Sequence, residues 1–283
     1  MPKKAIQFMI ISALAFTFLN VFVKQLLQFH VYQIVFFRSV GSVFFTMGFL
    51  LRYKIPIFGN QKSLLVIRSL VGVTSMALFF AAMKHLPIGT AVSLRYIAPI
   101  FAAFFAIIFL HEKIKHIQWL FFAIAFSGVL ILKGFDTQIN TIGLLFALSA
   151  ALLSGVVFIL LRKIGKRDHP VVVVNYFMII AAILSGILVV PYWKNPVGIE
   201  WLLLGCLGVF GYFGQIYMTK AFQAEETNQV APLKYLEVIF TMAIGLSWFD
   251  ETYTLWGLIG IFLIVIGLTL NIIYGRANNK VLK

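Results

Sequence analysis

The sequence predicts an all-α integral membrane protein of ten transmembrane helices, arranged as two inverted five-helix repeats. Its 283 residues are 61% hydrophobic and only 11% charged, and the mean hydropathy is +0.99, whereas soluble domains mix polar and apolar residues far more evenly. Apolar runs recur along the whole length, each about 18 residues or longer and therefore able to cross a hydrocarbon core about 30 Å thick. An uneven distribution of basic residues and an internal repeat predict how these spans are arranged.

Charged and interfacial residues mark the boundaries of the expected spans. The first apolar run follows Lys3 and Lys4 and contains a signal-peptide-like Ala-Leu-Ala at 13–15, but it continues to Val23, which indicates an uncleaved helix. All five tryptophans fall near span ends, as in the aromatic belts of membrane proteins. The ten spans are expected at about residues 5–23, 31–51, 63–84, 86–110, 116–133, 140–161, 170–192, 199–219, 228–249 and 254–274.

Basic residues are distributed unevenly between the two ends of these spans. With the N-terminus in the cytoplasm, fifteen lysines and arginines fall on the cytoplasmic side and four on the outer side. This bias predicts that both termini are cytoplasmic, and we expect the bacterial cytoplasmic (inner) membrane. The formal net charge of +14 is thus a topology signal, and no nucleic-acid partner is expected. The cytoplasmic residues are Lys3, Lys4, Arg52, Lys54, Lys62, Lys113, Lys115, Arg162, Lys163, Lys166, Arg167, Lys220, Arg276, Lys280 and Lys283, and the outer residues are Lys24, Lys84, Lys133 and Lys194.

A shift of 139 residues aligns the first half of the chain with the second without a gap. The aligned pairs include Arg95 with Lys234, Tyr96 with Tyr235 and Glu112 with Glu251. The chain is therefore predicted to consist of two five-helix repeats, residues 1–137 and 138–283. Because five is odd, the second repeat would enter the membrane from the opposite face, an inverted arrangement that many secondary transporters use.

Three segments carry a resemblance to a known family. They are FFRS at 36–39, the stretch from LVIRS to FLHEKI at 65–114, and the stretch from QIYMTK to FDETY at 215–253. Arginine, small-residue helix, proline and terminal glutamate follow in the order of the EamA-type repeat, so nearly the whole chain resembles the drug/metabolite transporter superfamily. The resemblance implies the fold and a transport function, and leaves open amino acids, nucleotide sugars, cofactors, phosphorylated metabolites and drugs as substrates. Pro99 is the proline of the first copy, whereas Val238 stands at that place in the second.

Two equivalent cations lie inside apolar spans, where exposure of a charge to lipid costs several kcal/mol. Arg95 and Lys234 occupy matching repeat positions, and each precedes a tyrosine, Tyr96 or Tyr235. On continuous helices, small or modest residues would extend both faces, which favours an open cavity, with tight helix packing as the alternative. We expect the two cations to bind or gate substrate, with structural pairing as the other interpretation. The face residues are Pro99, Ala102, Ala103 and Ala106 after Arg95, and Val238, Thr241, Met242 and Gly245 after Lys234.

Other polar residues within the spans are candidates for the same cavity. Arg38 could bind substrate or hold its span to a neighbour's carbonyl groups. Arg68 lies near the start of its span, so it could act in gating or simply reach the cytoplasmic surface. Glu237 is the one acid placed deep in a span, three residues after the second cation, and it could exchange protons or form a static pair with that cation. Gln215 and Asn20, like the tyrosines, could donate hydrogen bonds to substrate or only pack.

Glutamates, histidines and glycines near the span ends favour structural roles. Glu112 and Glu251 end spans four and nine at opposite membrane faces and are expected to cap or pin helices. The run HEKIKH at 111–116 is similar to a zinc-protease motif, but its histidines are five residues apart and would not share one helix face. We therefore expect no metal and no cofactor. The glycines at 205, 208, 211 and 214 are expected to allow close helix packing, with a flexible helix as the alternative.

Two functional classes remain, a secondary transporter and an intramembrane enzyme or non-transporting membrane protein. The sequence contains no GxSG, GxGD or HExxH motif and no P-loop, which favours the transporter. Four cations against one acid within the spans predict a positive cavity suited to an anionic or zwitterionic metabolite, such as an amino acid or a nucleotide- or phosphate-bearing molecule. A proton-coupled exporter of amphipathic or cationic drugs is the alternative. The expected partners are this metabolite and the lipid bilayer, with protons or a counter-substrate as candidate coupling species, and the chain is expected to be a monomer or a dimer.

Overall fold

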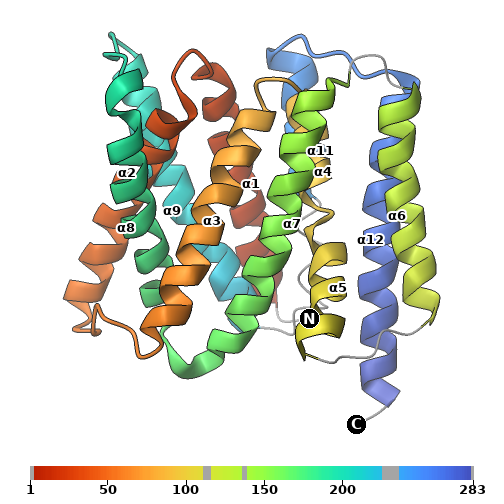
Figure 1. The fold of residues 1–283 in the computed structure, drawn as a ribbon, viewed down its shortest axis with the longest axis horizontal. Helices are drawn as coiled ribbons and strands as arrows, with labels where there is room; N and C mark the ends of the chain where they lie inside the picture. The colour runs from red at the N-terminus through yellow and green to blue at the C-terminus, as the bar shows by residue number, and fades with distance from the viewer. Residues whose placement is uncertain (1–2, 111–115, 136–138, 225–235, 282–283) are drawn as a thin grey trace.

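The computed structural model describes residues 3–110, 116–135, 139–224 and 236–281, and every regular element within these ranges is a helix. The helices run roughly side by side between two ends of the molecule, and α1 begins at the same end at which α12 finishes (Figure 1). The elements are α1 (Lys3–Gln25), α2 (Val31–Arg52), α3 (Lys62–Ala82), α4 (Ile88–Arg95), α5 (Ala98–Leu110), α6 (His116–Phe135), α7 (Thr141–Ile164), η1 (Gly165–Arg167), α8 (Pro170–Val189), η2 (Val190–Tyr192), α9 (Glu200–Ala224), α11 (Leu236–Trp248) and α12 (Leu255–Val281).

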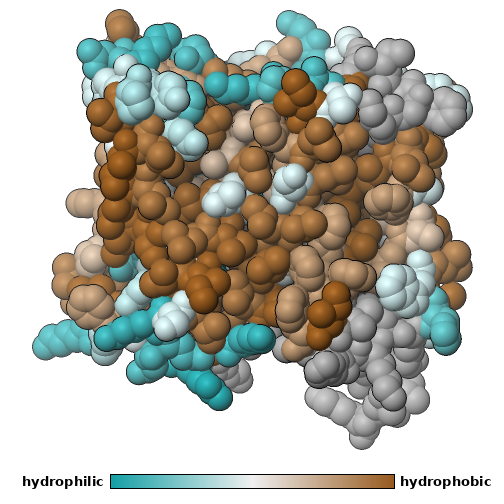
Figure 2. All heavy atoms as spheres, viewed as in Figure 1, coloured by the Kyte–Doolittle hydropathy of each residue, from teal (hydrophilic) through white to brown (hydrophobic). Residues whose placement is uncertain are grey.

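The lengths and compositions of these helices make the protein a multi-pass integral membrane protein. Within the described ranges, six helical stretches are long and apolar enough to cross a membrane, and they belong to α1, α2, α3, α7, α8 and α9. Four shorter apolar stretches lie at 88–102, 116–131, 236–248 and 255–271. Figure 2 shows the same division on the surface, where a broad hydrophobic band separates two hydrophilic ends.

Helices from distant parts of the chain pack as pairs. The main pairs are α1 with α9, α2 with α8 and α9, α3 with α7, and α6 with α12, and the last pair forms one side of the molecule (Figure 1). Glycines permit the closest of these approaches: a Cβ built on Gly208 of α9 would lie 2.5 Å from the Cα of Gly41 of α2. Close approach of small residues is a common way for helices to associate in membranes, because lipid tails compete with larger apolar side chains.

The fourth expected span is interrupted, which corrects the prediction of one helix over 86–110. Helix α4 ends at Arg95, Tyr96 is its C-cap, and α5 begins at Ala98. Pro99 explains the break, because proline has no N–H to donate to the carbonyl of the residue four positions earlier and disfavours helical geometry in the residue before it. The face predicted to run from Arg95 through residues 99–106 therefore does not exist as one continuous helical face.

Helices α5 and α11 occupy similar places in the two halves of the chain. The described parts of these helices begin at Ala98 and Leu236. Helix α11 is the described part of the ninth expected span, whose first residues, 228–235, lie outside the described residues. Helices α4 and α11 pack against each other. The last residues of α4 therefore lie close to the first described residues of α11, inside the bundle.

Candidate substrate site

A buried carboxylate joins three helices where α4 ends and α11 begins. Glu237, in the first turn of α11, is only 3% exposed. Its Oε2 accepts a 2.6 Å hydrogen bond from the hydroxyl of Tyr96, the C-cap of α4, and its Oε1 accepts a 2.9 Å bond from Nδ2 of Asn20 on α1. A carboxylate is favoured at this place because the N-terminal end of a helix carries partial positive charge. The structure thus brings together three residues that the sequence had proposed separately.

Three arginines lie around the same interior, and each guanidinium stacks on an aromatic ring. The distances from the arginine Cζ to the ring centroid are 4.4 Å for Arg95 over Phe79, 5.7 Å for Arg38 over Phe80, and 4.3 Å for Arg68 over Phe177. The rings of Phe79 and Phe80 lie 5.9 Å apart, so Arg95 and Arg38 stack against neighbouring residues of α3. Stacking on a ring stabilises a cation by up to about 2 kcal/mol when it is desolvated, so the rings offset part of the cost of burial.

None of these arginines has a carboxylate partner among the described residues. The one ion pair found there joins Lys24 Nζ to Glu251 Oε1 at 3.1 Å. Arg38 also donates through Nη1 to the sulfur of Met76, a weak acceptor. The arrangement therefore presents positive charge and unused N–H donors to the interior, which suits an anionic ligand.

The position of Arg68 corrects one interpretation of the sequence. Arg68 had been expected either to act in gating or to reach the cytoplasmic surface, but the residue is only 7% exposed and lies over Phe177 of α8. Its Nε and Nη1 have no hydrogen-bond partner within the described part of the chain. Reaching the surface is therefore the wrong interpretation, and the stacking geometry explains why the side chain remains inside.

Arg38 also departs from one of its two expected roles. Its only hydrogen bond among the described residues goes to the thioether of Met76, and its Nε is unpaired. No carbonyl group of a neighbouring helix accepts from it in that part of the chain. The structure therefore gives no support to the idea that Arg38 holds α2 to a neighbour's backbone.

Glu251 contacts the start of α4, at the opposite end of that helix from Arg95. Its two carboxylate oxygens each accept from the backbone N–H of Ile88 at 3.0 Å, at the first residue of α4. The hydroxyl of Tyr253 donates to Glu251 at 2.8 Å and accepts from the N–H of Gly89 at 3.2 Å. Burial, the nearby charge of Glu251 and the hydrogen bond that Tyr253 donates to Glu251 raise the pKa of Tyr253. Glu251 therefore supplies the N-terminal cap that Pro87 cannot give α4.

The remaining proposed residues are placed as follows. Gln215 lies half-buried on α9 beside Gly214, whose carbonyl accepts a 2.8 Å bond from Ser12 of α1. Lys234, Tyr235 and Glu112 lie outside the described residues, and the side chain of Pro99 is not described. The structure thus contains no test of the proposed pairing between the second cation and Glu237.

Several residues around the site were missed by reasoning from the sequence. Phe79, Phe80 and Phe177 support the guanidinium groups, yet nothing distinguishes them among the 30 phenylalanines of the chain. Lys24 was counted only as an outer charge, although it also donates to the carbonyls of Met83 and Leu86. Its ion pair with an acid 227 positions away carries no local signal in the sequence.

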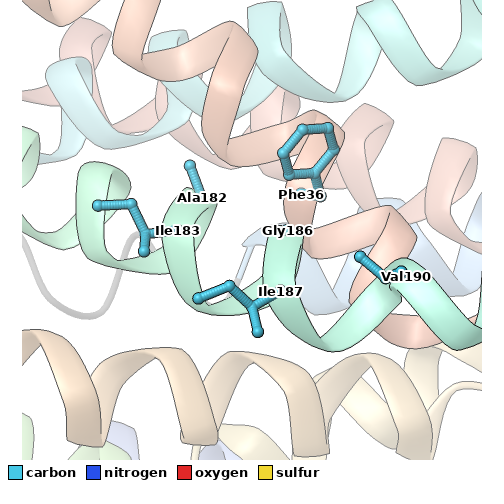
Figure 3. Close-up of a pocket in the computed structure, with 6 residues that line it drawn as sticks. All are labelled: Phe36, Ala182, Ile183, Gly186, Ile187 and Val190. Carbon is cyan, nitrogen blue, oxygen red and sulfur yellow. The ribbon is translucent and has the colours of Figure 1, made fainter.

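A groove on the outside of the bundle is a separate feature. It lies between α2 and α8 and is lined by Phe36, Ala182, Ile183, Gly186, Ile187 and Val190 (Figure 3). The lining is apolar, and Ile187 and Val190 are 65% and 71% exposed. Such a surface fits acyl chains of lipid, not a charged cargo. Among the described residues, no three metal-ligating side chains lie together.

Comparison with known proteins identifies the family. The model of the EamA-like transporter family matches the chain twice, over residues 3–133 and 141–273. The chain belongs to the EamA-like transporter family. The expected membership of the drug/metabolite transporter superfamily, whose members are transporters, is therefore confirmed.

Individual relatives of this EamA-family chain are transporters of different kinds. Human solute carrier family 35 member G1 is 28% identical over 93% of this chain and 77% of its own length. The pseudopaline exporter CntI of Pseudomonas aeruginosa is 24% identical over 88% and 89% of the two chains, and the S-adenosylmethionine uptake transporter of Rickettsia conorii is 27% identical over 87% and 84%. A solved crystal structure with 17% identity superposes with a TM-score of 0.69 over 98% of both chains, a likeness of fold alone.

Proposed function

We propose that this EamA-family chain is a secondary active transporter of small anionic or zwitterionic metabolites, such as amino acids or nucleotide- or phosphate-bearing molecules. The observation that carries the proposal is the set of three interior arginines, Arg38, Arg68 and Arg95, which stack on rings and have no carboxylate within ion-pair distance among the described residues. Guanidinium groups hold carboxylate or phosphate oxygens in a bidentate geometry. An anionic or zwitterionic cargo would compensate the three arginine charges, which have no carboxylate partner in the described part of the chain.

The proposed mechanism is alternating access between two inverted repeats, residues 1–137 and 138–283, that together provide ten transmembrane helices. Two observations support it. The family model matches the chain twice, over residues 3–133 and 141–273, and the helical path of the first half breaks between α4 and α5, next to Arg95. Transporters with inverted repeats commonly place their sites where such discontinuous helices end near the membrane midplane.

Each proposed site residue has a distinct role in this mechanism. Arg95, at the end of α4, and Lys234, its repeat equivalent, would hold the acidic group of the cargo in alternation, with Arg38 as a further anionic contact. Tyr96, Tyr235, Asn20 and Gln215 would supply hydrogen bonds. Pro99, Glu112 and Glu251 would set the geometry of the short helices, and Arg68, on the neighbouring helix α3, would have a structural or gating role.

A proton-coupled exporter of amphipathic or cationic drugs is the second candidate. The observation that favours it is Glu237, a carboxylate 3% exposed that accepts hydrogen bonds from Asn20 and Tyr96. Proton uptake by this group would remove its charge and weaken both bonds. One named relative exports its substrate and another takes its substrate up, so the direction of transport is not part of the proposal.

The proposed location is the bacterial cytoplasmic membrane with both termini in the cytoplasm. The start of α1 and the end of α12 share one end of the bundle (Figure 1). Most lysines and arginines of the segments between helices are expected at that end, which positive-inside statistics assign to the cytoplasm.

Transport into proteoliposomes by the Arg95→Ala variant tests the proposal. A panel of amino acids and phosphate-bearing metabolites, with and without a proton gradient, first identifies a cargo of the wild type. Arg95→Ala should then lower the apparent affinity for that cargo roughly tenfold or more, because a charge-assisted contact is worth about 1.5–3 kcal/mol. Arg95→Lys should restore only part of the affinity, because an ammonium group lacks the fork of the guanidinium.

Arg52→Ala is the matched control, because it removes an exposed arginine from the last turn of α2. Normal affinity in Arg95→Ala together with a lower melting temperature would contradict the proposal and make Arg95 a structural residue. A wild type that transports no anionic or zwitterionic compound, but carries a cationic drug against a proton gradient, would favour the second candidate.

A further inference from the structure

Buried nitrogen donors without acceptors are concentrated on three neighbouring helices. Within the described part of the chain they are Nε of Arg38 on α2, Nε and Nη1 of Arg68 on α3, and Nδ2 of Asn175 on α8. Arg38 is 4% exposed, Arg68 is 7% exposed and Asn175 is fully buried. Unsatisfied buried donors are rare in folded proteins, and unsatisfied charged donors are the most costly. All of these groups require an acceptor, so a complementary ligand would have to bring oxygen atoms.

The stacking geometry leaves the edges of the two guanidinium groups available. Arg68 lies over the ring of Phe177 and Arg38 over the ring of Phe80. The N–H bonds of a guanidinium lie in its own plane, so a ring against one face restrains the group without occupying its donors. The rings therefore hold two arginines in place for a partner that approaches along their edges.

Glycines let the helix backbones approach the unpaired nitrogens closely. A Cβ built on Gly211 of α9 would lie 3.2 Å from Arg38 Nε, and a Cβ built on Gly72 of α3 would lie 3.1 Å from the ring of Phe177 and 3.6 Å from Arg68 Nη1. A side chain at either position would press on a guanidinium group or on the ring that supports it. Both positions differ from the apolar groove between α2 and α8, whose lining contains neither arginine (Figure 3).

The acidic residues that the structure describes either form hydrogen bonds and ion pairs with other groups or lie near the surface. Glu237 accepts from Asn20 and Tyr96, and Glu251 pairs with Lys24. Asp168 caps the start of α3 by accepting from the N–H groups of Asn60 and Gln61, at 2.5 and 3.2 Å. The other two described acids, Glu200 and Asp250, lie at the ends of helices near the surface of the molecule.

We infer that Arg38 and Arg68 form an oxyanion-binding site between α2, α3, α8 and α9, separate from the Glu237 junction, whose ligand is a carboxylate or phosphate group. The two like charges lie on helices that pack together, α2 and α3, and an anion that contacts both would offset their mutual repulsion. The inference that this site binds an oxyanion does not depend on the protein being a transporter. The further step, in which the ligand is the acidic group of the cargo, rests on the proposed function.

Thermal unfolding of the purified full-length protein in detergent, titrated with inorganic phosphate, tests this site. Phosphate should raise the melting temperature of the wild type in a saturable way, because a ligand that binds only the folded state stabilises it. Arg38→Met and Arg68→Met should abolish that increase. Each should also melt at a higher temperature than the ligand-free wild type, because each removes an uncompensated buried charge. Arg68→Lys should weaken phosphate binding roughly tenfold.

Two control variants separate the site from general effects of charge and folding. Arg52→Ala removes an exposed arginine and should respond to phosphate as the wild type does. Gly72→Ala presses a Cβ against the Phe177 ring that supports Arg68, without changing charge, and should weaken binding. Gly48→Ala, on α2, meets nothing within 4 Å and should not. If Arg68→Met does not fold, the paired glycine variants test the same site.

Several results would overturn the inference. They are a wild type that phosphate and acetate both leave unchanged, a phosphate response that survives Arg38→Met and Arg68→Met, and a response that Arg52→Ala removes as well. Stabilisation by phosphatidylglycerol but not by phosphate would assign the donors to a lipid head group and exclude a free anion. A positive phosphate titration in a protein that transports no anion would keep the site and reject the proposed function.

Discussion

The crossing of α2 and α9 makes a sharp prediction about packing, because two glycines place their backbones in contact. A Cβ on Gly208 would lie 2.5 Å from Gly41 Cα, and ordinary contacts of a Cβ begin at about 3.4 Å. The Gly208→Ala variant must therefore push the two helices apart by roughly 1 Å. The same movement would stretch the 3.2 Å hydrogen bond from Ser42 Oγ to the carbonyl of Gly208.

The expected cost follows from this geometry. Overpacking of a close contact costs about 1–3 kcal/mol, and a protein of this size loses roughly 2–4 °C in melting temperature per kcal/mol. Gly208→Ala should therefore melt about 2–12 °C below the wild type. Gly205→Ala is the matched control on the same helix, since its Cβ would meet nothing within 4 Å. That variant should be unchanged or more stable, because alanine is the better helix former by about 0.5–1 kcal/mol.

Melting of the purified variants, followed by loss of the monodisperse peak in size-exclusion chromatography, measures the difference. A lower melting temperature for Gly208→Ala with an unchanged Gly205→Ala would support contact between α2 and α9 as the reason for glycine. Equal melting temperatures for the two variants would refute it, and would favour the alternative that the glycines make α9 flexible.

Three further predictions concern the carboxylates and the topology. Glu251→Gln should lower stability by about 1.5–3 kcal/mol, because it removes the charged partner of Lys24 and weakens the cap of α4. Glu200→Gln, at the partly exposed start of α9, should change the melting temperature little. If transport is proton-driven, Glu237→Gln should abolish its pH dependence and leave counterflow exchange measurable; an unaltered pH profile would exclude this residue from coupling. In a cysteine-free background, single cysteines in the 193–199 loop should react with an impermeant thiol reagent from outside, and those in the 162–169 loop only from the cytoplasm. The reverse pattern would contradict the inverted-repeat arrangement.

Composition and the spacing of apolar runs were sufficient to predict a helical membrane protein, and the segments at 36–39, 65–114 and 215–253 resemble the family to which the chain belongs. Each segment separately bears the cost of placing polar backbone or charge in hydrocarbon. The length of an apolar run therefore predicts a transmembrane helix even when the helices that pack against it are unknown. The prediction was less accurate at the fourth span, where the length of the apolar run favoured one helix over 86–110. Pro99 was recognised as a feature of the family, but its effect on the carbonyl of Arg95 was not used, and the structure ends α4 at that residue.

The roles of individual polar residues depended on partners that are distant in the sequence. Glu237 was identified from the sequence as a buried acid, yet its contacts with Tyr96 and Asn20 span 141 and 217 positions. Arg68 had two interpretations because its distance from the span end permits both. The ring of Phe177, 109 positions away, decided between them by holding the guanidinium inside.

The sequence by itself therefore determined the membrane class, the family, the expected topology and which residue types carry charge into the bundle. Each of these follows from local composition, from the repeat or, for the family, from the resemblance of motif-bearing segments. Only the tertiary structure decided which charges are paired. Lys24 pairs with Glu251, which also caps the N-terminus of α4. In contrast, Nε of Arg38 and Nε and Nη1 of Arg68 have no described acceptor. The physical reason is that compensation of a buried charge depends on atoms within a few ångströms, and packing of helices from both halves of the chain brings those atoms together.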